Sequence, residues 1–203
     1  MLGLNMVCRH PRRARSLACG LLLAVSLISC RRAAPPAAAR EVEPTYDPKT
    51  GRLTRLAADS NGNGVPDTWG YMDGSRVIRV ETDEDEDGRI DRWEYHRTTG
   101  SAADQGRPDQ TLERIERSTR RDGRVSRWEY FTDGVLSRAE EDTTGNGKVD
   151  KWETYTAGAL SMIALDTRGS GKPDRRLVYR PDGTFDREDV DPTGSGHFEP
   201  IEP

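Results

Sequence analysis

Residues 83–94 form an acidic stretch with the residue types and spacing of a cation-binding loop. Oxygen side chains occupy positions one, three, five, nine and twelve: Asp83, Asp85, Asp87, Asp91 and Glu94. Gly88 at position six allows the sharp turn that a residue with a Cβ resists, and the carbonyl of Arg89 at position seven is a further ligand. Ca²⁺ is a hard cation that takes several oxygen ligands, and this spacing lets one short loop wrap around it. The stretch therefore predicts a Ca²⁺ site.

Weaker copies of this loop recur along the chain, with first positions at Asp59, Asp83, Ser118, Asp142, Asp166 and Asp191. The intervals are 24, 35, 24, 24 and 25 residues, and the long one contains an insertion of 11 residues at about 96–110. Self-similarity at a fixed period is typical of repeat architectures. The sequence thus predicts tandem repeats over residues 59–199, followed by a short tail at 200–203.

The copies differ in how many ligands they keep. The fourth has Asp142, Thr144, Asn146, Asp150 and Glu153, with the carbonyl of Lys148 at position seven. The first has Asp59, Asn61, Asn63 and Asp67, with the carbonyl of Val65, but Gly70 stands at position twelve. We predict Ca²⁺ in the first, second and fourth copies, with dissociation constants of about 10⁻⁴ to 10⁻³ M, as in extracellular modules.

The third and fifth copies carry arginine where a ligand is expected. The third has Ser118, Arg120 and Ser126 in place of acids, so we predict no ion there and a salt bridge from Arg120 or Arg121 instead. The fifth has Arg168 at position three. For any single loop the alternative is a plain turn, because Asp, Asn and Gly build turns without a metal. Five carboxylates crowded into the second copy repel one another unless a cation lies between them.

Short aromatic segments separate the loops. Tryptophan stands ten residues after four loop starts, at Trp69, Trp93, Trp128 and Trp152, and a tyrosine follows two or three residues later. Such period-two segments joined by Asp-Gly or Ala-Gly turns predict β-hairpins. Helices are excluded because the segments are only a few residues long and are interrupted by glycine. The predicted fold is all-β: an antiparallel hairpin meander, forming a single twisted sheet or an open solenoid. The aromatic residues are expected to align on one face as the main core.

The loops resemble the calcium loops of EF-hands, dockerins and thrombospondin type 3 repeats, and Asp83 to Asp91 matches the Asp-x-Asp-x-Asp-Gly-x-x-Asp core. That resemblance implies calcium binding. The aromatic hairpins with Asp-Gly turns are also similar to the MORN-like repeats of bacterial surface and antitoxin proteins. This second resemblance implies an interaction role.

The N-terminal segment has the features of an export signal. Four arginines between Arg9 and Arg15 precede an apolar run from Ser16 to Ile28, which is too short for a comfortable membrane span. Leu-Ile-Ser before Cys30 resembles the lipobox of bacterial lipoproteins, which implies cleavage after residue 29 and acylation of Cys30. The resemblance implies anchoring to the cell envelope, with the outer membrane favoured. Residues 30–58 are then expected to be an Ala/Pro-rich tether.

Composition restricts the partners. Charged and apolar residues each make up 33% of the chain, which leaves little for a thick core. Residues 1–29 hold four of the 31 basic residues and none of the 35 acidic ones, so the remainder has 27 basic residues and a net charge of −8. This balance argues against nucleic acid and favours cations. A protein or glycan partner stays open, as does the oligomeric state.

The sequence favours a non-catalytic role. His96 and His197 have no partner that indicates a nucleophile or a catalytic metal, and the glutamates after three tryptophans occupy equivalent repeat positions: Glu94, Glu129 and Glu153. We therefore expect a lipid-anchored, calcium-binding scaffold. The alternative is a metal-independent hairpin module for interaction or immunity, in which the acidic loops are only turns.

Overall fold

The computed structural model describes residues 42–97 and 111–201. The predicted signal peptide, Cys30 and residues 98–110 of the insertion lie outside the described residues. The described residues contain thirteen β-strands and no helix: β1 (Val42–Tyr46), β2 (Leu53–Ala58), β3 (Thr68–Asp73), β4 (Arg76–Thr82), β5 (Arg92–His96), β6 (Leu112–Arg117), β7 (Arg127–Thr132), β8 (Val135–Glu141), β9 (Lys151–Thr156), β10 (Ala159–Leu165), β11 (Arg175–Tyr179), β12 (Phe185–Val190) and β13 (Glu199–Pro200).

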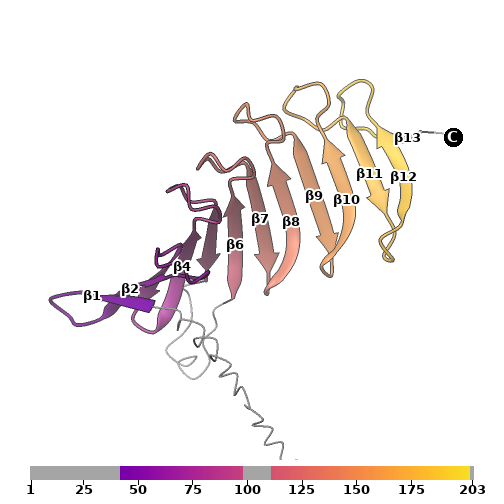
Figure 1. Cartoon of the computed structure of the whole chain (residues 1–203). Helices are drawn as coiled ribbons and strands as arrows, with labels where there is room; N and C mark the ends of the chain where they lie inside the picture. The colour runs from indigo at the N-terminus through magenta and orange to yellow at the C-terminus, as the bar shows by residue number, and fades with distance from the viewer. Residues whose placement is uncertain (1–41, 98–110, 202–203) are drawn as a thin grey trace, which may run out of the picture. The chain divides into compact units, whose positions relative to one another are not determined.

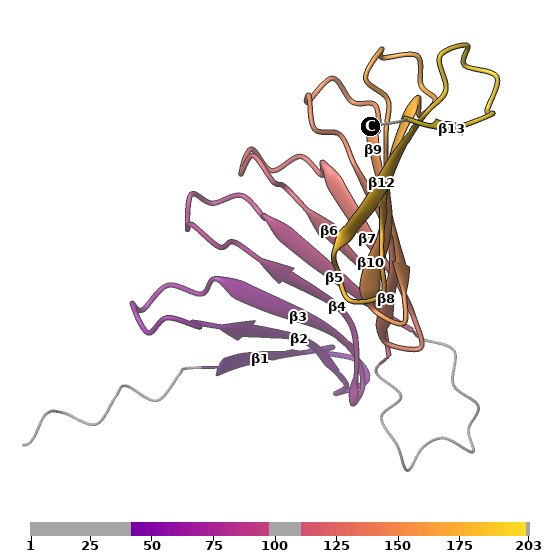
Figure 2. The same cartoon turned by 90° about the vertical axis from the view of Figure 1, so that its right-hand side faces the viewer.

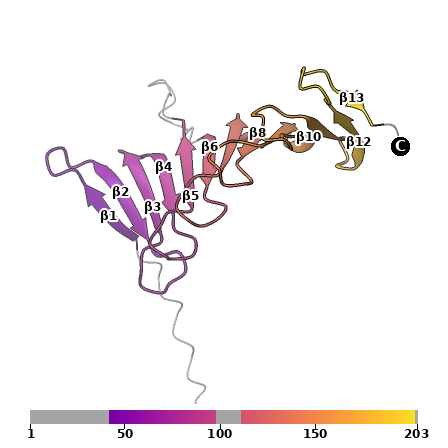
Figure 3. The same ribbon diagram turned by 90° about the horizontal axis from the view of Figure 1, so that it is seen from above.

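Each strand pairs antiparallel with its sequence neighbours, so the sheet is an open meander in the order β1 to β13. Figure 3 shows the strands following one another in a single layer, and the change in strand direction between β1 and β12 in Figure 2 shows the twist. The predicted all-β hairpin meander is therefore confirmed in its open, single-sheet form.

The connections at the two ends of the strands differ. The repeat loops all lie at one end of the strands, and the short hairpin turns lie at the other end (Figure 1). In the β7–β8 turn both Asp133 (φ 51°) and Gly134 (φ 77°) have left-handed backbones. Such a turn matches the twist of the flanking strands, which explains why the Asp-Gly signal predicted a hairpin correctly.

The sheet begins earlier than the sequence analysis predicted, because β1 and β2 lie within the expected tether at 30–58. Asp47 closes the turn between these strands by accepting the backbone N–H groups of Lys49 (2.8 Å) and Thr50 (2.7 Å). Ala57 on β2 is buried and pairs with Trp69 on β3. The prolines and alanines of this region suggested an extended tether, but part of it forms a hairpin that adds two strands to the sheet before the first loop.

Tryptophans and glutamates alternate across one face of the sheet, which we call the aromatic face. Trp69 pairs with Glu81, Glu81 with Trp93, and the alternation continues across the sheet to Trp152 on β9. A second row on this face alternates tyrosine with arginine: Tyr71, Arg79, Tyr95, Arg114, Tyr130 and Arg138. The predicted aromatic ladder is present from β3 to β9, but charged side chains interleave it.

The charged residues of the aromatic face are tied to its rings. The Arg79 guanidinium stacks on Tyr71 at 4.3 Å and pairs with Glu81 at 3.1 Å, and the Tyr71 hydroxyl donates to Glu81 at 2.7 Å. The hydrogen bond to Glu81 is the main cause that raises the pKa of Tyr71. The same three contacts recur around Tyr95 with Arg114 and Glu116. Cation–π contacts, ion pairs and hydrogen bonds thus link the side chains of this face, which no second sheet covers among the described residues.

The tyrosine–arginine row stops at Arg138 on β8, because the tyrosine spacing changes on β9 and Thr154 lies opposite Arg138. Tyr155 follows Trp152 by three residues, so strand alternation places it on the opposite face, where its hydroxyl donates to Glu153 at 2.8 Å. The expectation that every tyrosine would share the tryptophan face is therefore wrong for Tyr155.

Buried apolar side chains are few: among the described residues they are Ala57, Ile115, Ala139 and Ala164. The tryptophans are only half-buried, so they do not form an enclosed core. Most buried side chains are polar, and most of these are Asp or Ser at positions one and nine of the repeat loops. The fold is therefore held largely by cross-strand pairs and by its loops.

Candidate metal centre

The six repeat loops share one backbone frame, here numbered from the first position to the ninth: 59–67, 83–91, 118–126, 142–150, 166–174 and 191–199. The side chain at position one accepts the backbone N–H of position six in every loop, and in the first, fourth and sixth loops it also accepts those of positions four and five. Asp59 accepts from Gly62 (2.6 Å), Asn63 (3.2 Å) and Gly64 (2.7 Å), and Asp142 and Asp191 have the equivalent bonds. In the third loop the hydroxyl of Ser118 plays this part.

Positions four and six have left-handed backbones in all six loops. Position six is always glycine, and Gly88 in the second loop has a φ of 87°, as the sequence predicted. Position four is glycine in four loops, but it is Glu86 (φ 60°) in the second and Arg121 (φ 54°) in the third. These two side chains are projected toward neighbouring loops by a conformation that L-residues rarely adopt.

Successive loops are linked through their backbones. The N–H at position one of each loop donates to the carbonyl at position nine of the preceding loop, as from Asp83 to Asp67 (2.9 Å) and from Ser118 to Asp91 (2.7 Å). The same bond joins every later pair of loops. The loops therefore form a continuous row at one end of the strands. Position one of each loop lies beside position nine of the loop before it.

The second loop brings three carboxylates together. Ligand oxygens of Asp83, Asp85 and Asp91 lie within 4.8 Å of one another, a separation that suits coordination of one metal ion. Asp83 and Asp91 are 6% and 3% exposed, and Oδ2 of each accepts one backbone N–H, from Gly88 (2.9 Å) and Glu84 (3.1 Å) respectively. The Oδ1 atoms of Asp83 and Asp91 are buried and have no hydrogen-bond partner among the described residues.

These orphaned oxygens are energetically unusual. Buried polar atoms are almost always hydrogen-bonded, because an unpaired one loses its solvation without compensation. Burial raises the pKa of Asp91, and the nearby carboxylates of Asp85 and Asp83 raise it further. By contrast, the N–H donor of Gly64 is the main cause that lowers the pKa of Asp59 in the first loop. The second loop therefore differs from the first in holding two buried carboxylate oxygens that no described donor reaches.

The remaining residues predicted for the second site lie outside the three-carboxylate group. Asp87 is 3.7 Å from Arg89 and accepts its backbone N–H at 2.9 Å. Glu94 lies on β5 and pairs with Arg92 at 2.6 Å. An extended strand directly after the loop carries position twelve away from the turn, whereas a helix would bring it back. The structure therefore brings together three of the five predicted carboxylates, and a ligand role for Asp87 and Glu94 stays a prediction.

In the fourth loop the predicted ligands are satisfied by the protein. Thr144 donates to Asp142 (3.3 Å), the side-chain oxygen of Asn146 accepts the N–H of Lys148 (2.8 Å), and Asp150 accepts that of Thr143 (2.9 Å). Burial acts to raise the pKa of Asp142, but its backbone N–H donors outweigh this and the pKa is lowered. Glu153, predicted at position twelve, instead lies on β9 and binds Arg127. Ca²⁺ binding here stays a prediction.

The first loop is closed in a similar way and is also bonded to the second. Asn61 and Asn63 accept the N–H groups of Asn63 (3.0 Å) and Val65 (2.7 Å), and Asp67 accepts that of Ser60. The amide groups of Asn61 and Asn63 both donate to the Glu86 carboxylate of the second loop. Sequence reasoning missed this use of Glu86, although glycine at position four of other loops marked the position as special. Ca²⁺ binding in the first loop also stays a prediction.

Arginines of the third loop reach both neighbours. Arg121 lies 3.5 Å from Asp85 of the second loop, and Arg120 donates to the carbonyl of Asp142 in the fourth loop at 2.9 Å. Ser118 and Ser126 are 4% and 3% exposed and fill positions one and nine without charge. The predicted salt bridge is thus formed by Arg121, but with an adjacent loop.

No family model matches the chain, and no curated protein matches it. Among solved structures, the chain is similar to one in the crystal structure of accessory secretory protein 1, 2 and 3 in Streptococcus pneumoniae, with 14% identity and a TM-score of 0.29. The similarity covers 62% of this chain and 19% of that one. None of the described residues forms a helix long and apolar enough to span a bilayer.

Proposed function

We propose that this chain is a non-catalytic, calcium-binding repeat protein, anchored to the cell envelope through Cys30, whose sheet serves as a scaffold for a protein or glycan partner. The observation that carries the calcium proposal is the pair of buried, unpartnered oxygens of Asp83 and Asp91 beside Asp85. A divalent cation would pair with both oxygens and remove the repulsion among the three carboxylates.

The donor set favours Ca²⁺ over other metals. Carboxylates are hard oxygen ligands, and the group contains no imidazole or thiolate of the kind that favours zinc or copper. Ca²⁺ accepts six to eight oxygens in flexible geometry, so the backbone carbonyl of Arg89 and water could complete its shell. The exposed position of Asp85 gives an ion direct access from solvent.

A metal-independent interaction module is the second candidate, and the first and fourth loops favour it. In both loops the position-one carboxylate is fully engaged by backbone N–H groups: Asp59 in the first and Asp142 in the fourth. These loops hold their shape with no ion, as expected of turns. The two candidates differ in one measurable respect, which is whether calcium changes the stability of the protein.

Calorimetric titration of the full-length protein with CaCl₂ tests the proposal. The wild type is expected to bind at least one ion, and the double variant Asp83→Asn/Asp91→Asn is expected to lose the tightest event. Asp182→Asn is the matched control, because it makes the same chemical change in a hairpin turn at the opposite end of the strands. There the Asp182 carboxylate accepts the backbone N–H of Thr184. A tightest event that survives in the double variant would contradict the assignment of the ion to Asp83 and Asp91. Absence of binding heat in the wild type, with equal melting in calcium and in chelator, would favour the metal-independent module.

The anchor is tested separately. Cys30 is outside the described residues, and its acylation is inferred from the resemblance to the lipobox. A Cys30→Ser variant is expected to leave the membrane fraction and to incorporate no labelled fatty acid. Retention of both properties would contradict the lipid anchor without bearing on the calcium site.

A further inference from the structure

Position three distinguishes the loops most sharply in charge. The second loop has Asp85 there, while the third and fifth loops have Arg120 and Arg168. In the second loop this position contributes a ligand oxygen to the carboxylate group. In the two arginine loops it contributes a fixed positive charge.

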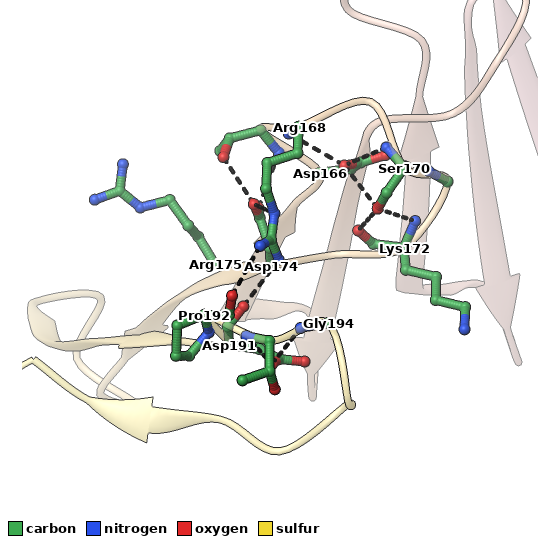
Figure 4. A network of polar contacts seen from close by, with 12 residues as sticks. Asp166, Arg168, Ser170, Lys172, Asp174, Arg175, Asp191, Pro192 and Gly194 are labelled. Atoms are coloured by element: carbon green, nitrogen blue, oxygen red, sulfur yellow. Dashed lines mark hydrogen bonds and ion pairs between the residues drawn. The ribbon is translucent and has the colours of Figure 1, made fainter.

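Arg168 uses all three of its nitrogens within the fifth and sixth loops (Figure 4). Its Nε lies 2.7 Å from Oδ2 of Asp174, at position nine of its own loop. Nη2 donates to the carbonyl of Asp191 at 2.9 Å, and Nη1 donates to that of Pro192 at 3.0 Å. One carboxylate and two carbonyls are the oxygen types that a divalent cation would take.

The same carboxylate position has opposite surroundings in the second and fifth loops. Asp91 and Asp174 both occupy position nine and are 3% and 6% exposed. Oδ1 of Asp91 has no hydrogen-bond partner among the described residues, whereas both oxygens of Asp174 are bonded, to Thr167 and to Arg168. Oδ2 of Asp174 thus accepts from the Thr167 hydroxyl and is paired with the Arg168 guanidinium, whereas Oδ1 of Asp91 has neither a donor nor a cation beside it among the described residues.

Arg120 repeats part of this arrangement. Its Nη2 donates to the carbonyl of Asp142, which is position one of the next loop, as Asp191 is for Arg168. A Cβ on Gly145, at position four of that next loop, would lie 2.7 Å from the Arg120 guanidinium carbon. Glycine at position 145 therefore leaves room for the bridge.

We infer that the residue at position three decides whether a repeat loop takes a divalent cation. Aspartate leaves a cluster of carboxylates that admits the ion, and arginine supplies the positive charge internally while tying its loop to the next. This inference rests on the proposed function for the second loop. It makes the fifth loop a latent cation site that its own arginine keeps closed.

Exchange of position three between the loops tests the inference. Arg168→Asp gives the fifth loop carboxylates at positions one, three and nine, as in the second loop, and full-length Arg168→Asp is expected to bind one Ca²⁺ more than the wild type. Its melting temperature should fall in chelator and recover in calcium. Arg168→Ala, which loses the bridge without gaining a ligand, should fall in both conditions alike.

Lys172→Asp is the matched control, since it makes the same charge change in the same loop with a side chain that points away from Arg168 (Figure 4). It should gain no ion. If Arg168→Asp folds but binds no more calcium than the wild type or the control, the inference is overturned. If the wild type itself binds no calcium, the result contradicts the proposed function instead. Should Arg168→Asp not fold, Asp85→Arg decides: loss of the tightest binding event supports the inference, and an unchanged tightest event overturns it.

Discussion

Arg127 on β7 donates from Nη2 to Oε2 of Glu153 on β9 at 2.6 Å, reaching across the intervening strand β8. The Glu153 carboxylate also binds Lys151 (2.7 Å) and the hydroxyl of Tyr155 (2.8 Å). Burial acts to raise the pKa of Glu153, but these donors outweigh it and lower the pKa to about 2. Burial, followed by the hydrogen bond to Glu153, raises the pKa of Tyr155 to about 12. Few apolar side chains are buried among the described residues, so this network is one of the polar contacts that join neighbouring strands.

The Glu153 network predicts a specific acid sensitivity. Because the folded pKa is depressed from 4.5, the stabilisation is present above pH 4.5 and is lost as the pH falls toward 2. The Glu153→Gln variant should be about 3 kcal/mol less stable than the wild type at pH 7, and the difference should vanish near pH 2. Urea unfolding between pH 2 and 7 measures this. A difference that does not change with pH would rule out the ionised pair as its cause.

Glu140→Gln provides the comparison for that experiment. Glu140 pairs with Arg138, whose side chain is 54% exposed, on the aromatic face. Exposed ion pairs contribute about 0–1 kcal/mol, so this substitution should have a small effect that depends little on pH.

Two aspartate-to-asparagine substitutions should have opposite effects in chelator. Asp91→Asn removes a buried charge that its neighbours repel and keeps an acceptor for the N–H of Glu84, so it should stabilise the ion-free protein. Asp59→Asn weakens a carboxylate that accepts three N–H groups, so it should destabilise the protein. Thermal melting in EDTA measures both. Destabilisation by Asp91→Asn in EDTA would indicate that the carboxylate is already satisfied without an ion.

The edge strand β1 carries a proline that should limit association. Pro44 pairs with Leu56 and lacks an N–H, so an incoming strand finds one donor fewer on the outer edge, which pairs with no described strand. Pro44→Val should therefore self-associate as concentration rises, whereas the wild type and the control Val42→Thr should not. Sedimentation analysis over a hundredfold range of concentration tests this. Identical behaviour of the three proteins would mean that the proline does not protect the edge.

The sequence predicted the hairpin meander because aromatic period-two segments and Asp-Gly turns specify strands and turns locally. It predicted positions one and nine of the loops because their carboxylates close the turn whether or not an ion is present. It did not show the contacts of Glu94 and Glu153, since the twelfth position approaches an ion in the loop only when the chain after the loop bends back. Here a strand begins instead, and both glutamates bind arginine.

Contacts between loops could not be predicted from one repeat considered alone. Glu86 binds two asparagines of the preceding loop, and Arg168 binds carbonyls of the following one. Both interactions depend on which loops lie side by side, and only the sheet order fixes that. The left-handed position four was visible in the sequence as a recurrent glycine, and Glu86 and Arg121 could have been noticed as its exceptions.

A crystal structure of the full-length protein grown with CaCl₂ tests the central claim most directly. We expect one ion in the second loop, with oxygens of Asp83, Asp85 and Asp91 at about 2.3–2.6 Å from it, and with Arg168 still bridging the fifth and sixth loops. Anomalous scattering at a wavelength sensitive to calcium identifies the ion. Water in that position, or the guanidinium of Arg121 among the three carboxylates, would contradict the assignment of this loop as a calcium site.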